Sequence, residues 1–335
     1  MNKKAFEIQF NWIFVLVAGA AILLFFTVVV VKWKNVSESS TKATVLKSIE
    51  AIVIGAGVST DTISIISIPN SNIEASCGRI SLGGISKQYQ NAILFAPSLI
   101  KGDKLITQTS AFGVPYRAAN LLYMTSPRIR YIIIGDTELA KDLNKSMPSN
   151  LKKEFYQSLP ESIRNENNYK IKFVFFGNID KNFLKNLEKM PDSDVTAINV
   201  AGDKEKGKIE FYQKDGTSWL SKGASAYIGK ASLLGAIYTD TLEMYECNMQ
   251  NTFARLHFIT KIYAEKTKKL MQISSVSTRQ IQCSEFYNRA LAQLNRIYAA
   301  SSGIGIESVN EIADSAKLLS NENKNAQVYS CTLIY

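Results

Sequence analysis

Three polar residues that could bind a metal ion stand just after apolar runs of the sequence. Asp136, Asn178 and Asp203 each follow a glycine that closes such a run. Carboxylate and amide oxygens are ligands that Mg²⁺ and Ca²⁺ prefer, and a metal held there could assist a hydrolysis. The same residue types also cap helices and form turns, which is their more common role. The trio is therefore a candidate metal site, with turns and caps as the alternative.

Composition restricts other catalytic chemistry. The only histidine is His257, which argues against most zinc sites and most nucleophiles activated by histidine. We expect His257 to be a solvated or core helix residue. Gly55 and Gly57 resemble the start of a dinucleotide-binding turn, but Thr60 stands where the third glycine belongs. We therefore predict no catalytic residue and no cofactor.

The four cysteines indicate a compartment. They are Cys77, Cys247, Cys283 and Cys331. An even count without a C-x-x-C pair is compatible with two disulfides outside the cytoplasm, among three connectivities. The alternative is four buried thiols in a cytosolic domain.

The apolar stretch of residues 8–31 predicts a transmembrane helix. It contains 24 residues without a charge, about 36 Å of helix, which is enough to cross a bilayer. Trp12 and Trp33 bracket it, as interfacial aromatic anchors do. A cleaved secretory signal is the alternative, but its apolar part is normally only about 7 to 15 residues long. We expect an uncleaved anchor that contacts membrane lipid through residues 8–31.

The orientation of this anchor follows from its short leading segment. Lysines flank the apolar stretch on both sides. The positive-inside rule, by which the more basic flank stays in the cytoplasm, therefore hardly distinguishes the two orientations. A tail of a few residues ahead of a long apolar helix usually stays in the cytoplasm. We expect a single-pass protein of the cell membrane with a cytoplasmic N-terminus and an extracytoplasmic C-terminal domain.

Two resemblances concern the start of the chain. Residues 6–20 and the ending, residues 330–335, are similar to those of uncharacterised single-pass membrane proteins of small-genome archaea. This resemblance implies a surface-anchored archaeal protein and no particular activity. Residues 3–6 resemble the class III signal of type IV pilins, although Ala5 replaces the usual glycine and Glu7 is displaced from the usual position. That resemblance implies processing after Ala5 and a pilin-like subunit.

The middle of the chain predicts strands and then alternating strands and helices. Residues 37–41 read as a polar spacer before an amphipathic helix, and residues 63–125 as a β-rich layer. Beyond residue 128, apolar runs at 131–134, 171–176 and 195–200 alternate with helical segments at 137–143 and 180–190. This alternation favours a parallel sheet covered on both faces.

The C-terminal part predicts a helical hairpin. Residues 240–272 carry apolar residues at seven-residue intervals, and residues 281–300 have a helical core pattern. A coiled-coil homodimer is the alternative to packing within the chain. With the turn near residue 275, Cys247 and Cys283 differ by about 20 residues, or about 30 Å, in height, whereas a disulfide needs Cα atoms within about 7 Å.

A third helix over residues 307–319 would return the tail towards the hairpin turn. It would bring Cys331 near Cys283 and leave Cys247 facing the β-rich layer that holds Cys77. We therefore predict the pairs Cys77 with Cys247 and Cys283 with Cys331.

Charge points to an anionic partner. The 335 residues include 39 Lys and Arg against 29 Asp and Glu, a net charge of +10. Residues 251–300 contain eight Lys or Arg and two Glu, a balance of +6. This basic region favours an anionic surface, a lipid headgroup or a cell-wall polymer. An extracytoplasmic location argues against nucleic acid.

The sequence thus predicts an α+β protein with a transmembrane helix, a β-rich layer, an α/β sheet with parallel strands and a C-terminal helical hairpin. The expected parts are the anchor at 1–36, the spacer and juxtamembrane helix at 37–60, the β-rich and α/β ectodomain at 61–215 and the helical region at 216–335. The expected function is non-enzymatic binding or assembly in the cell envelope. A metal-assisted hydrolase at the three strand ends and a pilin-like subunit are the alternatives.

Overall fold

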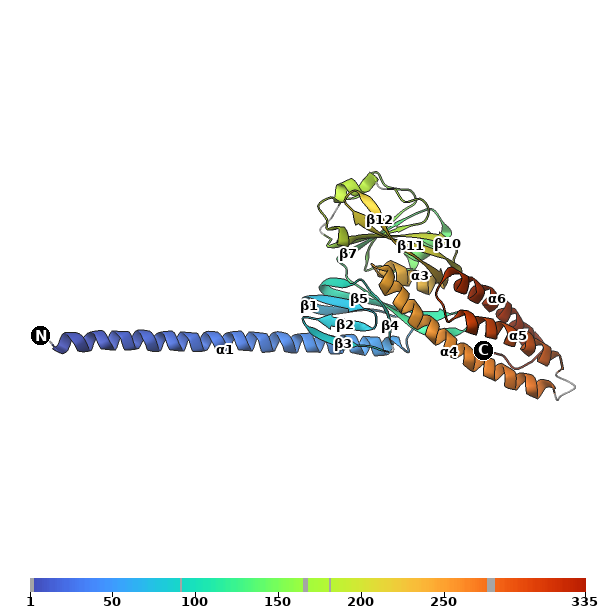
Figure 1. Cartoon of the computed structure of the whole chain (residues 1–335), viewed down its shortest axis with the longest axis horizontal. Helices are drawn as coiled ribbons and strands as arrows, with labels where there is room; N and C mark the ends of the chain where they lie inside the picture. Colours follow the sequence, from blue (N-terminus) through green and yellow to red (C-terminus); the bar gives the residue numbers. More distant parts are fainter. Residues whose placement is uncertain (1–2, 91, 165–167, 181, 276–280) are drawn as a thin grey trace. The chain divides into compact units, whose positions relative to one another are not determined.

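The computed structural model describes residues 3–90, 92–164, 168–180, 182–275 and 281–335. It divides the chain into two units, residues 1–49 and residues 50–335. The described part of the first unit lies within one long helix, α1 (Lys3–Ala56), which continues into the second unit (Figure 1). The second unit contains two sheets and the remaining helices.

Part of α1 is apolar enough to cross a membrane. Val15–Lys34 has a mean hydropathy of 2.6 and is not buried by the rest of the chain. By length and composition this segment can serve as an anchor or as a signal sequence. Trp33 is 76% exposed, and the side chain of Trp12 lies outside the described residues.

The prediction that a spacer at residues 37–41 separates two helices is wrong, because α1 passes through these residues without interruption. Neither glycine nor proline occurs between Gly19 and Gly55, so nothing in this stretch ends a helix. The hydroxyl of Thr44 donates to the carbonyl oxygen of Ser40 at 3.0 Å. The hydroxyl of Thr44 thus finds its partner one turn back along the helix itself. The boundaries of the predicted segment 37–60 therefore do not match elements of the structure.

The β-rich layer is confirmed as a six-stranded sheet, sheet A, with the order β3-β2-β1-β5-β6-β4. All neighbours are antiparallel except β4 and β6, which are parallel. Its strands are β1 (Ile63–Ser76), β2 (Arg79–Leu82), β3 (Ile85–Gln88), β4 (Ile93–Phe95), β5 (Leu99–Gly113) and β6 (Arg117–Thr125).

The predicted parallel strands are confirmed in a second six-stranded sheet, sheet B, with the order β12-β11-β10-β9-β7-β8. The four strands β8, β7, β9 and β10 are parallel, and β11 and β12 are antiparallel additions. The strands are β7 (Ile129–Ile134), β8 (Lys152–Tyr156), β9 (Lys170–Phe175), β10 (Val195–Gly202), β11 (Lys206–Asp215) and β12 (Ser218–Ile228). The helix α2 (Glu138–Ser146) follows β7, close to its predicted place.

Two sequence predictions in this region are wrong. The segment 180–190 forms the short 3-10 helix η1 (Asn182–Leu187) instead of an α-helix, and Pro191 disfavours a helical conformation of the residue before it. A second 3-10 helix, η2 (Asp192–Asp194), follows at once. The helical region does not begin at residue 216, because β12 is still part of sheet B. The sequence of β12 has no clear two-residue alternation of apolar and polar residues, which agrees with the mixed exposure of this strand.

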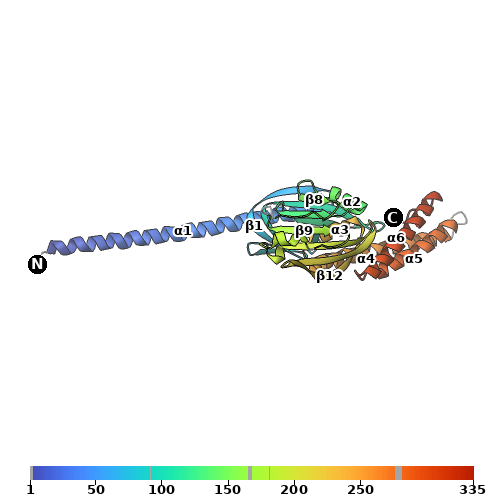
Figure 2. The same cartoon turned by 90° about the horizontal axis from the view of Figure 1, so that it is seen from above.

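The helical hairpin is confirmed as α4 (Leu242–Ser275) and α5 (Ile281–Ala300), and α6 (Ile306–Val328) returns along α5 (Figure 1 and Figure 2). On the predicted heptad positions of α4, Tyr245, Met249 and Leu256 are buried within the chain. The helix α3 (Gly229–Tyr238) precedes the hairpin and contacts β5 and β6 of sheet A and β12 of sheet B. It therefore lies in the common core of both sheets.

Both predicted cysteine pairs are present as disulfides. Cys77, between β1 and β2, is bonded to Cys247 of α4 with the Cα atoms 6.1 Å apart. Cys283 of α5 is bonded to Cys331, which follows α6, with the Cα atoms 5.7 Å apart. The first bond joins sheet A to the helical region, and the second joins the two ends of the α5–α6 pair.

Candidate functional site

The three residues predicted as a metal site follow neighbouring parallel strands. Asp136 follows β7, Asn178 follows β9 and Asp203 follows β10, so that all three belong to the same edge of sheet B. All three are exposed. A carboxylate oxygen of Asp136 lies 3.0 Å from the amine of Lys141, and the helix α2 is capped by the next residue, Thr137, whose hydroxyl accepts from the amide of Ala140 at 3.1 Å.

Asp203 is occupied by the turn between β10 and β11. Its carboxylate accepts from the amides of Lys206 at 3.0 Å and Glu205 at 2.7 Å. These backbone hydrogen bonds lower the pKa of the carboxyl. At Gly202 an added Cβ would lie 2.5 Å from Gly207, so that the two strands can approach closely only with glycine here. Asp203 is thus a turn residue in this structure.

The described residues contain no group of three or more His, Cys, Asp or Glu placed to hold a metal ion. The turn role of Asp203 agrees with the alternative of turns and caps. Asp136 instead forms an ion pair with Lys141, and the cap of α2 is its neighbour Thr137.

A buried charged cluster that sequence reasoning missed lies between sheet B and the start of α4. The amine of Lys170 pairs with the carboxylate of Asp240, and both side chains are about 5% exposed. Asp240 also accepts from the amide of Ser98 at 2.9 Å and from its hydroxyl at 2.7 Å. Burial raises the pKa of Asp240, but Lys170 and Ser98 outweigh burial and hold it below its ordinary value.

Lys172 belongs to the same cluster. It lies two residues after Lys170 on β9, and side chains two apart share one face of a strand. Its amine donates to the carbonyl oxygen of Thr239 at 2.7 Å and lies 5.4 Å from the centre of the Phe211 ring. Burial lowers the pKa of this amine to about 7. Because Lys172 is only 3% exposed, the cluster fixes the start of α4 and does not present the amine to a substrate.

The signal for this cluster was visible in the sequence. Lysine at positions 170 and 172 interrupts an otherwise apolar strand, and lysine is rarely buried without a partner. The position of the partner Asp240, 70 residues further on, was not visible.

The single histidine has a packing role at the end of α5. The Nδ1 atom of His257 lies 2.9 Å from the carbonyl oxygen of Tyr298 and 3.1 Å from the hydroxyl of Ser301. Since a carbonyl oxygen can only accept, Nδ1 carries the proton in this arrangement. The imidazole also stacks on the Tyr298 ring with 3.8 Å between ring centres. His257 is half-buried, so that one side of the ring packs against α5 while part of it stays accessible to solvent.

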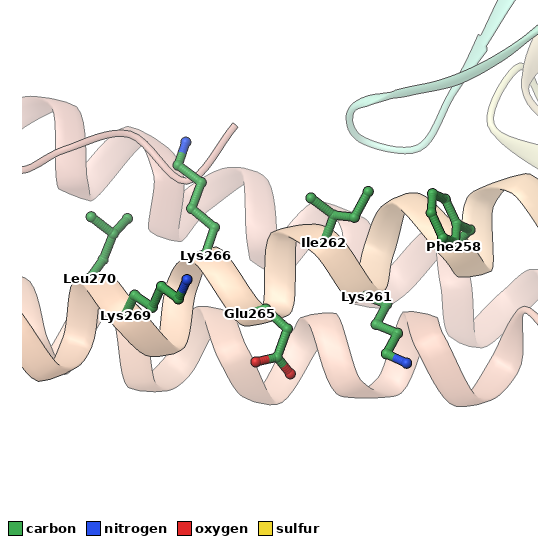
Figure 3. Close-up of a pocket in the computed structure, with 7 residues that line it drawn as sticks. All are labelled: Phe258, Lys261, Ile262, Glu265, Lys266, Lys269 and Leu270. Atoms are coloured by element: carbon green, nitrogen blue, oxygen red, sulfur yellow. The ribbon is translucent and has the colours of Figure 1, made fainter.

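An exposed face of α4, formed by the solvent-accessible residues within the range 258–273 and named here the α4 face, is the second candidate site. Phe258 and Ile262 are 63% and 51% exposed. A shallow pocket of about 600 Å³ runs along this face, lined by Phe258, Lys261, Ile262, Glu265, Lys266, Lys269 and Leu270. In Figure 3, Phe258, Ile262, Lys266 and Leu270 lie along one border of this face, and Lys261 and Glu265 lie along its opposite border. This face combines apolar and basic side chains within reach of solvent.

Comparisons with family models, with curated proteins and with solved structures find no match for this chain.

Proposed function

We propose that this chain is a single-pass membrane protein whose extracytoplasmic domain binds or assembles with another component of the cell envelope and catalyses no reaction. The observation that carries the proposal is the pairing of all four cysteines in two disulfides that span 170 and 48 residues. Disulfides persist in oxidising compartments and are rare in the cytosol. Together with the apolar segment Val15–Lys34, they support an anchored domain outside the cytoplasm.

The proposed orientation places the part of the chain downstream of the apolar segment outside the cytoplasm. The cysteines agree with that direction, since every one of them lies downstream of the anchor. Retention of the segment as an anchor, instead of its removal as a signal, is supported by its length.

Binding, as opposed to catalysis, is supported by what the candidate chemical groups do. Asp203 holds a turn, Lys172 is enclosed and His257 packs on Tyr298. The α4 face, by contrast, offers exposed apolar and basic side chains to a partner. Exposed apolar side chains bordered by polar residues are typical of interaction sites.

The test is topology in intact cells. The chain carries an epitope tag at each end, and protease is added to intact and to permeabilised cells. We expect the C-terminal tag to be lost in intact cells while the N-terminal tag survives until permeabilisation. A cytoplasmic marker protein that stays intact before permeabilisation is the control. A C-terminal tag that survives in intact cells and is digested only after permeabilisation would reverse the proposed orientation.

Thiol labelling tests the compartment independently. Cells are treated with a membrane-impermeant maleimide before and after an impermeant reductant. All four cysteines should label only after reduction. Labelling of free thiols in freshly lysed but unreduced cells would argue for a cytosolic domain.

A further inference from the structure

The α4 face is basic as well as apolar. Residues 258–273 contain four lysines and one glutamate, a net charge of 4 − 1 = +3. The glutamate, Glu265, pairs with Lys268 at 2.9 Å. The other three lysines, Lys261, Lys266 and Lys269, line the shallow pocket together with Phe258 and Ile262. Negative charge together with tolerance of apolar side chains is therefore the chemistry complementary to this face.

We propose that the α4 face binds the surface of an anionic lipid bilayer. The inference rests on the proposed anchoring, because a chain held in a membrane meets lipid headgroups at a high effective concentration. Clusters of four or more lysines on an amphipathic helix are typical of binding sites for anionic headgroups. The α4 face has this number of lysines within four turns of helix.

The shape of the site agrees with a flat partner. All seven residues that line the pocket come from α4 itself (Figure 3), so that the site is a strip along one helix and not a cleft between elements. A helix of this kind can lie in the interface, with large apolar side chains entering the boundary between headgroups and acyl chains. The lysine side chains can extend their amines to the phosphates while their methylene groups cover apolar surface.

Charge argues against a second copy of the chain as the occupant. Two α4 faces placed together would bring +3 against +3, and like charges that face each other across an interface are unfavourable. An anionic lipid surface has the complementary sign.

Vesicle binding by the full chain tests the inference. The chain is reconstituted in nanodiscs of phosphatidylcholine and titrated with vesicles of pure phosphatidylcholine or of phosphatidylcholine and phosphatidylglycerol at 7:3. Co-sedimentation measures the bound fraction. We expect binding to the anionic vesicles only, and weaker binding at high salt because exposed charges are screened.

Two variants separate the contributions. Changing Lys261, Lys266 and Lys269 together to Gln should weaken binding by about 100-fold, at about fivefold for each lysine near the surface. The variant Phe258→Ser with Ile262→Ser should weaken it by about tenfold, since two apolar side chains no longer enter the boundary. The matched control changes three exposed lysines elsewhere, Lys204, Lys222 and Lys317, to Gln. It has the same net charge as the first variant and should bind almost as well as the unchanged chain.

Three results would overturn the inference. The first is equal binding of the unchanged chain to both kinds of vesicle. The second is a loss of binding in the control variant that equals the loss in the lysine variant. The third is full binding by the serine variant together with efficient competition by soluble polyglutamate. The last result would identify an acidic polymer as the partner. The measurement does not depend on which side of the membrane holds the domain. The proposed lipid binding can therefore fail while the proposed location holds, and the proposed location can fail while lipid binding holds.

Discussion

The side-chain oxygen of Asn248 accepts a hydrogen bond from the backbone amide of Leu94 at 3.0 Å. Leu94 lies in β4, which is an edge strand of sheet A, and Asn248 is fully buried within α4. The amide nitrogen of Asn248 donates to the carbonyl oxygen of Met244 at 2.9 Å. One buried side chain thus supplies a backbone partner for the edge strand and joins it to α4.

Replacing this side chain should therefore cost stability. In Asn248→Leu the amide of Leu94 loses its partner away from water, and we expect the free energy of unfolding to fall by about 2 to 3 kcal/mol. Urea unfolding followed by circular dichroism measures the loss. The control Gln272→Ala, at an exposed position of the same helix, should change stability by less than about 0.5 kcal/mol. Equal stability of the two variants would show that the hydrogen bond contributes nothing.

The two disulfides should stabilise the fold to different extents. In the chain-entropy model a cross-link stabilises more when it closes a longer loop. For separations of 170 and 48 residues the model gives about 5 kcal/mol for Cys77–Cys247 and about 4 kcal/mol for Cys283–Cys331. Unfolding of each double serine variant measures these losses.

Peptide mapping without reduction checks the pairing itself. Two linked peptides should be found, one for each disulfide. A linked peptide that contains Cys247 and Cys283 would contradict the described packing of α4 and α5.

Lys172 should make stability depend on pH. Burial lowers the pKa of its amine to about 7 in the folded chain, whereas the unfolded value is about 10.4. Between these values the unfolded chain binds more protons at this site, so that stability rises with pH. The stability that depends on a neutral Lys172 amine is fully present above about pH 10.4. It decreases as the pH falls towards about 7 and is fully lost below that value. From pH 7 to pH 9, we expect the unchanged chain to gain on the order of 2 kcal/mol relative to Lys172→Met.

Urea unfolding at pH 7, 8 and 9 measures this difference. Lys222→Met, which removes an exposed amine from β12, is the control and should follow the unchanged chain. Parallel pH profiles for Lys172→Met and the unchanged chain would contradict a lowered pKa.

Gly235 should resist replacement although it lies in a helix. Alanine normally stabilises a helix by about 1 kcal/mol relative to glycine. At Gly235 in α3, however, an added Cβ would lie 2.7 Å from the ring of Phe95, and overpacking of a core costs about 1 to 3 kcal/mol. We expect Gly235→Ala to lower the melting temperature. Gly55→Ala, in α1 with no atom within 4 Å of the added Cβ, should leave it unchanged or raise it. A rise in both variants would contradict the tight contact with Phe95.

Periodic patterns and chain geometry predicted the elements that depend on local sequence. The seven-residue spacing in α4 gave its length and its buried side, and the hairpin turn then limited the partners of Cys283. Elements with mixed or uniform composition were missed. α3 is buried on nearly every side and therefore has no polar face to give a helical period. β11 mixes buried, half-buried and exposed residues, which obscures the alternation of apolar and polar residues.

The candidate sites show the same division between features that local sequence predicts and features that it does not. The common edge of Asp136, Asn178 and Asp203 follows from parallel strands and was predictable. The partners of Asp136 and Asp203 depend on turn geometry, which the residue types alone do not specify. The pairing of Lys170 with Asp240 depends on how β9 meets the start of α4, and such a contact between distant segments leaves no local pattern.

The bond between Cys77 and Cys247 also determines how this domain carries tension. A pull applied between the N-terminal helix and the α4–α5 hairpin enters sheet A through β1 and crosses to α4 through the disulfide. The residues between the two cysteines, which include most of both sheets, lie outside this covalent route. Under load in an oxidising environment, sheet B is therefore mechanically shielded, and reduction of this one bond would expose it to the force.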